Sequence, residues 1–404
     1  MRSDLVSDPS ALYVIQTILI ASVLYLFVLR EQRILRLQVI SWAVGVIAIM
    51  WRFGLDEQLG FYSNDQLHYN SVVRILMFWT WPPDEPMTAF WWVEFSKAPY
   101  PISALPLALA GIHSALALKT VSLVCLLALS RELLHRYRAV TLVDQTKVLY
   151  FTGCGLIGTF FSLVALRETM MMFFVYRFAT EKSIVNKLGS IFILFLLRSH
   201  LAAALIVAEL ALGLWRWFTK GRRLGFAETP SLILGGVTLG FMMFSWRFNG
   251  VQGYDLFRRL QTPFNGDFGI TETLQTASNY GGLQFLTAHE AFVRLSTVEL
   301  LLLRFVFSDT VLIPLGFTLV CLIVNHRLNE RHKFTLLAFT IYVSIVTNTD
   351  FNSFRQNIPL MPLMGVVILD YLDERKLRRL VSQRQGSDVA DELSTQYATR
   401  NVRL

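Results

Sequence analysis

The chain has 404 residues, of which 54% are hydrophobic and only 16% are charged, and its mean hydropathy is +0.47. A soluble domain usually carries about 25% charged residues, so this composition excludes an ordinary soluble protein and indicates a membrane protein. The net charge of +8 does not indicate a nucleic-acid partner, because the basic residues lie in short clusters between apolar runs.

Apolar runs recur along residues 1–372 and predict an all-α, polytopic transmembrane helical bundle of about eleven spans. The first run is too long for the core of a signal peptide and has no basic segment before it. The short runs between 148 and 217 leave two full hairpins and two pairs of re-entrant half-helices equally open. The predicted spans are 11–29, 37–53, 103–130, 148–165, 168–180, 187–198, 200–217, 231–247, 309–325, 334–348 and 356–372.

Basic residues predict the orientation of these spans. Six segments on one side of the membrane hold 22 of the 37 Lys and Arg residues of the chain. The positive-inside rule places this side in the cytoplasm, so the N-terminus is predicted to be external and the C-terminus cytoplasmic. Residues 373–404 are then a basic and, further on, polar cytoplasmic tail. The six segments are 30–36, 131–147, 177–187, 216–223, 326–333 and 373–384.

Two long external loops follow from this topology, at about 54–102 and 248–308. The first is rich in acidic residues and tryptophan, and its residues 66–81 have the spacing of a helix lying in the membrane interface. The second is predicted to contain an interfacial helix through His289 and Glu290, whose polar pair is more typical of a solvated helix face than of catalysis. Long loops with their own short helices are usually functional.

Charged residues inside apolar runs are the strongest functional signal. Arg167 and Glu168 interrupt one run, and Arg198 and His200 interrupt another. A charge at the bilayer centre costs roughly 2.5–3.5 kcal/mol, so such residues usually pair or line a polar cavity. Guanidinium groups bind phosphate oxygens in pairs, so two converging arginines would form a pyrophosphate clamp. A structural ion pair with Glu168, or an arginine reaching to the interface, is the alternative.

Two further residues lie at predicted membrane boundaries. Asp65 stands just outside the second span beside His68 and Tyr69, where a carboxylate could act as a general base. Asp65 could equally cap the helix predicted to follow it. Arg355 is predicted at the external mouth of the last span, where an interfacial anchor is the alternative. The three cysteines lie in apolar runs, and no spacing indicates a metal site.

Four short motifs resemble those of GT-C glycosyltransferases and of bacterial exopolysaccharide or O-antigen polymerases. Residues 64–69 resemble the acidic motif of the first external loop in GT-C enzymes. Residues 165–170 and 196–201 resemble the arginine motifs of membrane polysaccharide polymerases, and 354–362 resembles their final arginine-and-proline signature. The chain departs from the pattern in having Asn-Asp-Gln where paired acids are usual, and His200 where an aromatic residue is expected.

The resemblance implies a GT-C-like enzyme of the bacterial inner (plasma) membrane that uses an undecaprenyl-phosphate or -diphosphate sugar to build a cell-surface polysaccharide or glycolipid. Its catalytic residues would be Asp65 as the base and Arg167, Glu168 and Arg198 around the phosphates. The resemblance assigns no cofactor with certainty and leaves a divalent cation open. The residues expected to contact substrate are His68, Tyr69, Arg74, His200 and Arg355.

The implied partners are the lipid-linked sugar, membrane lipid and other polysaccharide-assembly proteins. Two other functions remain open on the sequence. One is a transporter or flippase of lipid-linked oligosaccharide, which would also need buried arginines for phosphates. The other is a non-catalytic subunit of a polysaccharide synthesis complex, in which the buried charges serve only the structure.

Overall fold

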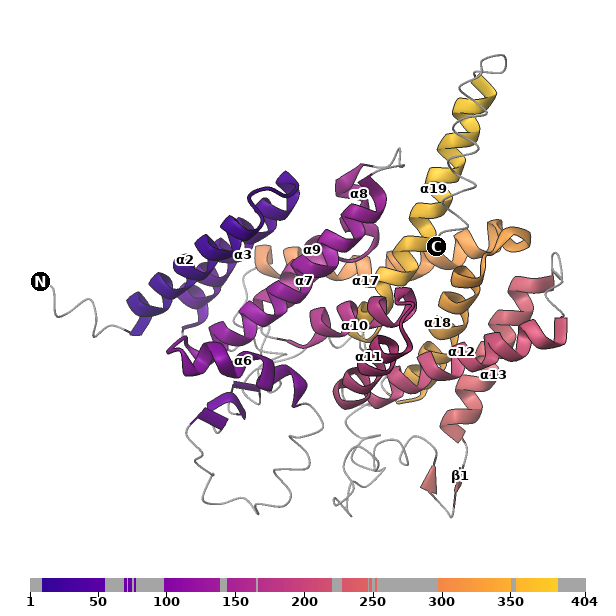
Figure 1. Ribbon diagram of the computed structural model, residues 1–404, viewed down its shortest axis with the longest axis horizontal. Helices are drawn as coiled ribbons and strands as arrows, with labels where there is room; N and C mark the ends of the chain where they lie inside the picture. The colour runs from indigo at the N-terminus through magenta and orange to yellow at the C-terminus, as the bar shows by residue number, and fades with distance from the viewer. Residues whose placement is uncertain are drawn as a thin grey trace, which may run out of the picture.

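The computed structural model describes residues 9–54, 69–70, 72–74, 76–77, 98–138, 144–164, 166–219, 227–245, 247–248, 251–252, 297–349 and 354–383. This part of the chain is helical, as predicted, apart from loops and one antiparallel pair of two-residue strands, β1 (Arg247–Phe248) and β2 (Val251–Gln252). The helices form an elongated array that runs from α2 and α3 at one side to α12, α13 and α18 at the other (Figure 1).

The two N-terminal helices, α2 (Pro9–Phe27) and α3 (Arg33–Phe53), pack against each other as a hairpin. Much of their outer surface is apolar and exposed, including Leu19 at 60% and Val44 at 62% exposure. Large exposed apolar surfaces mark membrane or protein contacts, so this hairpin presents a face suited to lipid chains.

The single span predicted at 103–130 is wrong, because two helices occupy this stretch. α6 (Pro99–Leu109) ends before Gly111, and α7 (Ser114–Arg138) begins after it. Gly111 has a φ of +88°, which residues with a Cβ rarely adopt, so this glycine permits the turn. α6 folds back against α7 rather than continuing it.

The stretch between 144 and 219 consists of helices separated by breaks. α8 (Gln145–Phe151) and α9 (Leu156–Leu163) meet at an angle of 61°, which fits either a broken span or a re-entrant loop at the predicted 148–165. α10 (Glu168–Thr180) and α11 (Ile184–Leu197) form a hairpin of 13- and 14-residue helices. Each helix is about 20 Å long, which is less than the ~30 Å hydrocarbon thickness of a bilayer.

The remaining helices complete the array, and each begins before its predicted start. The last predicted span, 356–372, is a 3₁₀ turn followed by a helix that runs to residue 383, so the helix continues into the first part of the segment predicted as a cytoplasmic tail. The stretch after Gly365 contains neither Gly nor Pro, and an Arg378–Glu374 pair one turn apart supports the helix. The elements are α12 (Ser199–Thr219), α13 (Glu228–Ser245), α17 (Thr297–Ile323), η4 (Asn325–Arg327), α18 (Glu330–Thr349), η5 (Phe354–Leu360) and α19 (Met361–Gln383).

Four helices in the described residues are long and apolar enough to cross a membrane, and the bent α8–α9 pair would make five. They are α2, α3, most of α7, and α12. α11 and residues 309–323 of α17 are apolar but shorter. The described part of the chain is therefore compatible with a multi-pass membrane protein.

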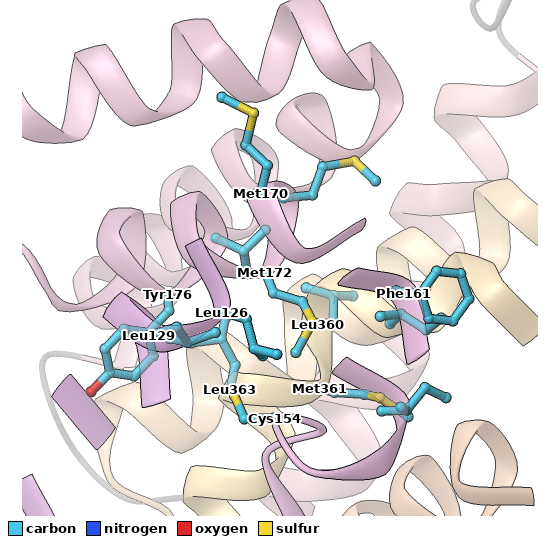
Figure 2. Packing of buried hydrophobic residues seen from close by; sticks show 14 of the residues in the cluster. Leu126, Leu129, Cys154, Phe161, Met170, Met172, Tyr176, Leu360, Met361 and Leu363 are labelled. Carbon is cyan, nitrogen blue, oxygen red and sulfur yellow. The ribbon is translucent and has the colours of Figure 1, made fainter. Parts of the chain in front are cut away.

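The core lies where α7, α9, α10 and the η5–α19 segment meet. Figure 2 shows apolar side chains from all four segments converging around the methionines of α10 and α19. Met172, Met361 and Phe161 are each 0% exposed. Flexible methionine side chains fill the irregular space between helices that end at different levels, and this packing fixes the start of α10.

α13 and α18 approach each other more closely than ordinary side chains allow. A Cβ on Gly236 would collide with the Thr340 hydroxyl, and one on Gly240 would lie 2.6 Å from Ser344 Cβ. Glycines four residues apart allow this close contact, as in other membrane helix pairs. The contact fixes the position of α18, which carries residues of both charged clusters described below.

Candidate functional site

Arg167 and Glu168 lie where α9 gives way to α10, as the charged break in this apolar run predicted. Arg167 occupies the position before the first helical residue, and Glu168 is the first residue of α10. An acidic side chain at this position interacts favourably with the positive end of the helix dipole. Glu168 is 0% exposed, so its charge needs compensation from neighbouring groups.

Arg198 lies at the junction between α11 and α12, in an extended conformation that separates the two helices. Because α11 returns antiparallel to α10, this junction lies beside the start of α10. Arg198 Nη2 is 3.8 Å from Glu168 Oε1, and Arg167 Nη1 donates a hydrogen bond to the Leu197 carbonyl. The structure therefore brings together three of the predicted catalytic residues, Arg167, Glu168 and Arg198. The first and last of these are 31 positions apart in the sequence.

His200 and Tyr342 complete this group of side chains. Arg198 Nη1 donates to the Tyr342 hydroxyl at 3.1 Å, and the His200 ring stacks on the Tyr342 ring at 5.7 Å between centroids. Tyr342 also interacts electrostatically with Arg167 and Glu168. We call Arg167, Glu168, Arg198, His200 and Tyr342 the arginine cluster.

The five described residues of the arginine cluster include two guanidinium groups and one carboxylate. Arg198 Nη2 lies 3.8 Å from Glu168 Oε1, which exceeds hydrogen-bond length. Arg167 Nε is buried and has no hydrogen-bond partner among the described residues. The starts of α10 and α12 add the partial positive charge of two helix N-termini. This arrangement favours an anion.

A hydrogen-bonded network holds the backbone just before Arg167. The Tyr100 hydroxyl lies 3.1 Å from the Leu118 carbonyl oxygen and 2.7 Å from Ser122 Oγ. Ser122 Oγ also lies 3.1 Å from the Leu166 carbonyl oxygen, so the two hydroxyl hydrogens are distributed over three hydrogen-bond contacts. Tyr69 packs edge-on against Tyr100, at 5.1 Å between ring centroids. α6 and α7 thereby fix the position of the backbone next to Arg167.

The comparisons with known proteins add no assignment. No family model, curated protein or solved structure matches this chain. The function must therefore be argued from the site itself.

One buried charge was missed by the sequence reasoning. Lys119 on α7 is 0% exposed and lies one helical turn before Ser122, on the same face of the helix. It is the single charged residue between 114 and 130, which is the same signal that identified Arg167 and Arg198. Tyr342 was also missed, because a tyrosine in an apolar helix does not differ from a core residue in sequence.

The other predicted residues are placed only in part. Asp65 and His68 lie outside the described residues, as does the helix predicted through His289 and Glu290. Arg355 lies in η5, but its side chain is outside those that the structure describes. The described residues of the 66–81 segment are helical, as predicted. One face of this segment is buried, with Tyr69 1% exposed and packed against α6.

Arg74, which was predicted to contact substrate, lies near the start of α7. Its Nε donates to Ser114 Oγ at 3.4 Å, and Ser114 Oγ donates to Asn70 Oδ1. These contacts tie the 69–77 segment to α7. Among the described residues, no group of three His, Cys, Asp or Glu side chains could hold a metal ion.

A second charged cluster lies toward the other end of α7 and α18. Asp370 on α19 accepts a 2.9 Å hydrogen bond from the Tyr137 hydroxyl and lies 3.3 Å from His332 Nε2. Arg136 Nη2 is 3.9 Å from the same carboxylate. We call Arg136, Tyr137, His332 and Asp370 the Asp370 cluster. It is separated from Ser122 by fourteen residues of α7, or about 20 Å.

Proposed function

We propose that this chain is a membrane glycosyltransferase or polysaccharide polymerase that uses an undecaprenyl-phosphate or -diphosphate-linked sugar. The observation that supports the proposal is that Arg167 and Arg198 meet at the α11–α12 junction, where Arg198 also pairs with Glu168. Such a surplus of guanidinium groups in an apolar protein suits an anionic ligand with several oxygens, and phosphate oxygens match the guanidinium geometry.

The depth of the arginine cluster suits a substrate whose phosphate lies near one membrane surface. The α10–α11 hairpin turns at the polar residues Glu181 and Lys182 and ends at the cluster, about 20 Å away. In a hydrocarbon layer of ~30 Å, a hairpin perpendicular to the membrane would place the arginines about 10 Å from the opposite surface. In the predicted topology of about eleven spans, that surface is the external face of the bacterial inner membrane.

The proposed reaction is a displacement at the anomeric carbon of the carrier-linked sugar. An acceptor hydroxyl attacks this carbon, and Asp65 takes the hydroxyl proton as general base. The bond between the anomeric carbon and the phosphate oxygen breaks, and the electron pair leaves with the carrier phosphate. Arg167 and Arg198 stabilise the negative charge that develops on this leaving group. His200 and Tyr342 hold Arg198 in place.

The first test measures polysaccharide or glycolipid output in cells that carry Arg167→Ala, Arg198→Ala or Asp65→Asn, normalised to protein in the membrane. Output is expected to collapse for all three while protein levels hold. Arg216→Ala is the matched control, because Arg216 lies on α12 with an exposed side chain paired to Glu330. Normal output from all three variants would overturn the proposal.

A transporter or flippase of lipid-linked oligosaccharide is the second candidate. The observation that favours it is the Asp370 cluster, which gives the bundle a second set of buried charges about 20 Å from the first. Purified protein separates the two candidates, since a transferase consumes lipid-linked sugar in detergent whereas a flippase needs sealed vesicles. A non-catalytic subunit would do neither.

A further inference from the structure

A cleft of about 690 Å³ lies between the α2–α3 turn, the C-terminal part of α7, and α10. These helices run side by side in the N-terminal half of the array (Figure 1). The volume falls within the range of small-molecule sites. The cleft is lined by Arg30, Glu31, Gln32, Leu35, Ala128, Arg131, Glu132, Leu134, His135, Phe173 and Arg177.

The cleft has a basic rim in which two of its three arginines are already held by carboxylates. Arg131 Nε is 2.9 Å from Glu31 Oε1, and Arg177 lies 3.8 Å from Glu132 and 2.9 Å from Glu181, which is outside the lining. Arg30 is exposed. The residues that line the cleft comprise three arginines and two glutamates, so the lining itself has a surplus positive charge. The cleft therefore complements an anion.

Gln32 adds a hydrogen-bond acceptor to the same cleft. Its Oε1 is buried and has no hydrogen-bond partner among the described residues. A buried acceptor without a partner is unfavourable, so a ligand that supplies a hydroxyl donor would stabilise this side chain. The cleft thus matches a ligand that combines an anionic group with a hydroxyl.

The cleft lies at the level where α2 leaves the apolar layer. The helix ends at Phe27, three residues before Arg30. Leu26 and Phe27 are 68% and 79% exposed and provide an apolar surface beside the cleft. The inner wall is also apolar, through Leu134 and Phe173. Acyl chains could therefore continue from an anionic headgroup in the cleft along the outside of α2.

We propose that this cleft binds an anionic phospholipid whose headgroup carries hydroxyl groups, as phosphatidylglycerol does. Basic pockets between transmembrane helices are known to bind anionic lipid headgroups. The cleft is distinct from the arginine cluster, because Arg177 lies ten residues along α10 from Arg167, or about 15 Å. The lipid is therefore a second ligand, and the inference is independent of the proposed enzymatic function.

The test compares Arg30→Gln with Arg33→Gln in purified protein reconstituted into nanodiscs of phosphatidylglycerol and phosphatidylcholine. Both arginines are exposed, and only Arg30 lines the cleft, so neither change should disturb the fold. Retained phosphatidylglycerol, measured by native mass spectrometry, should fall about fivefold in Arg30→Gln, as expected for removal of one basic residue near an anionic headgroup. It should not change in Arg33→Gln.

Two further arms distinguish the occupant. Gln32→Leu should abolish the preference for phosphatidylglycerol over phosphatidic acid, which lacks the glycerol headgroup. Inorganic phosphate should not displace the retained lipid, and displacement at millimolar concentration would assign the cleft to a soluble phosphate instead. Equal retention by wild type and Arg30→Gln, or equal losses in Arg30→Gln and Arg33→Gln, would overturn the proposal.

Discussion

The arginine cluster and the Asp370 cluster both contain buried charges, yet they satisfy these charges differently. Asp370 is contacted by a tyrosine hydroxyl at 2.9 Å, by a histidine at 3.3 Å and by Arg136 at 3.9 Å. In the arginine cluster, Arg198 forms a 3.8 Å ion pair with Glu168, and Arg167 donates to the Leu197 carbonyl. The first arrangement surrounds one carboxylate with hydroxyl, imidazole and guanidinium groups, whereas the second places two guanidinium groups at a helix junction beside one carboxylate.

This difference separates a cluster that stabilises helix packing from one that is arranged for a ligand. Asp370 is contacted by groups from two other helices, so the Asp370 cluster links α7, α18 and α19. A surplus of buried guanidinium charge is unfavourable until an anion binds. Changes in the Asp370 cluster should therefore reduce stability first, and changes in the arginine cluster should reduce activity first.

The largest effect is expected from Asp370→Ala. The substitution leaves Arg136 largely buried without its carboxylate, and breaking a buried pair in this way costs roughly 3–5 kcal/mol. Thermal unfolding in detergent should show a clearly lower midpoint than wild type. Asp144→Ala is the control, because Asp144 is exposed and makes no side-chain capping bond to α8. An unchanged unfolding midpoint for Asp370→Ala would contradict a structural role for the Asp370 cluster.

Arg198→Gln is expected to reduce activity about 100-fold, the effect of removing one group that stabilises developing negative charge. Polymer or glycolipid output per unit of membrane protein provides the measurement. The single variant also leaves Glu168 buried without Arg198, so its stability should fall. The double variant Arg198→Gln/Glu168→Gln should regain stability and remain inactive. Recovery of activity in the double variant would show that Arg198 serves only to neutralise Glu168.

Gly236→Ala should affect both clusters at once, because it forces α13 away from α18. The added Cβ would collide with the Thr340 hydroxyl, and overpacking of this kind costs about 1–3 kcal/mol. Gly235→Ala is a matched control, since a Cβ at Gly235 meets nothing within 4 Å. A lower unfolding midpoint is expected for the first variant alone. Equal behaviour of the two would contradict the close approach of these helices.

The smallest effects are expected from substitution of two tyrosines, each of which uses its hydroxyl to contact the central charged residue of one cluster. Tyr342→Phe keeps the ring on His200 but removes the hydroxyl that accepts from Arg198, so output should fall roughly tenfold. Tyr137→Phe removes a donor to Asp370 and should lower stability by about 1 kcal/mol with unchanged output. If both variants lost output equally, the distinction between the clusters would fail.

The charged residues of the candidate site could be predicted from the sequence. The positions at which helices break were predicted less well. Charged residues in apolar runs identified Arg167, Glu168 and Arg198, because the cost of burying a charge makes such residues rare. The same rule would have identified Lys119. The turn at Gly111 was missed because the apolar run continues across it, and hydropathy does not report the φ angle of a glycine. The last predicted span ended at residue 372, whereas the helix runs to residue 383, because hydropathy marks the end of an apolar run and not the end of a helix.

The sequence by itself determined the apolar helical character of this protein, which is compatible with a multi-pass membrane protein, and several of the charges that it buries, since both follow from the transfer of local side chains between water and lipid. Only the tertiary structure decided that Arg167 and Arg198 meet, because their approach depends on the α10–α11 hairpin. The structure likewise decided that Tyr342, 144 positions from Arg198, contacts it. That contact depends on the packing of α12 against α18, a non-local property that hydropathy does not contain.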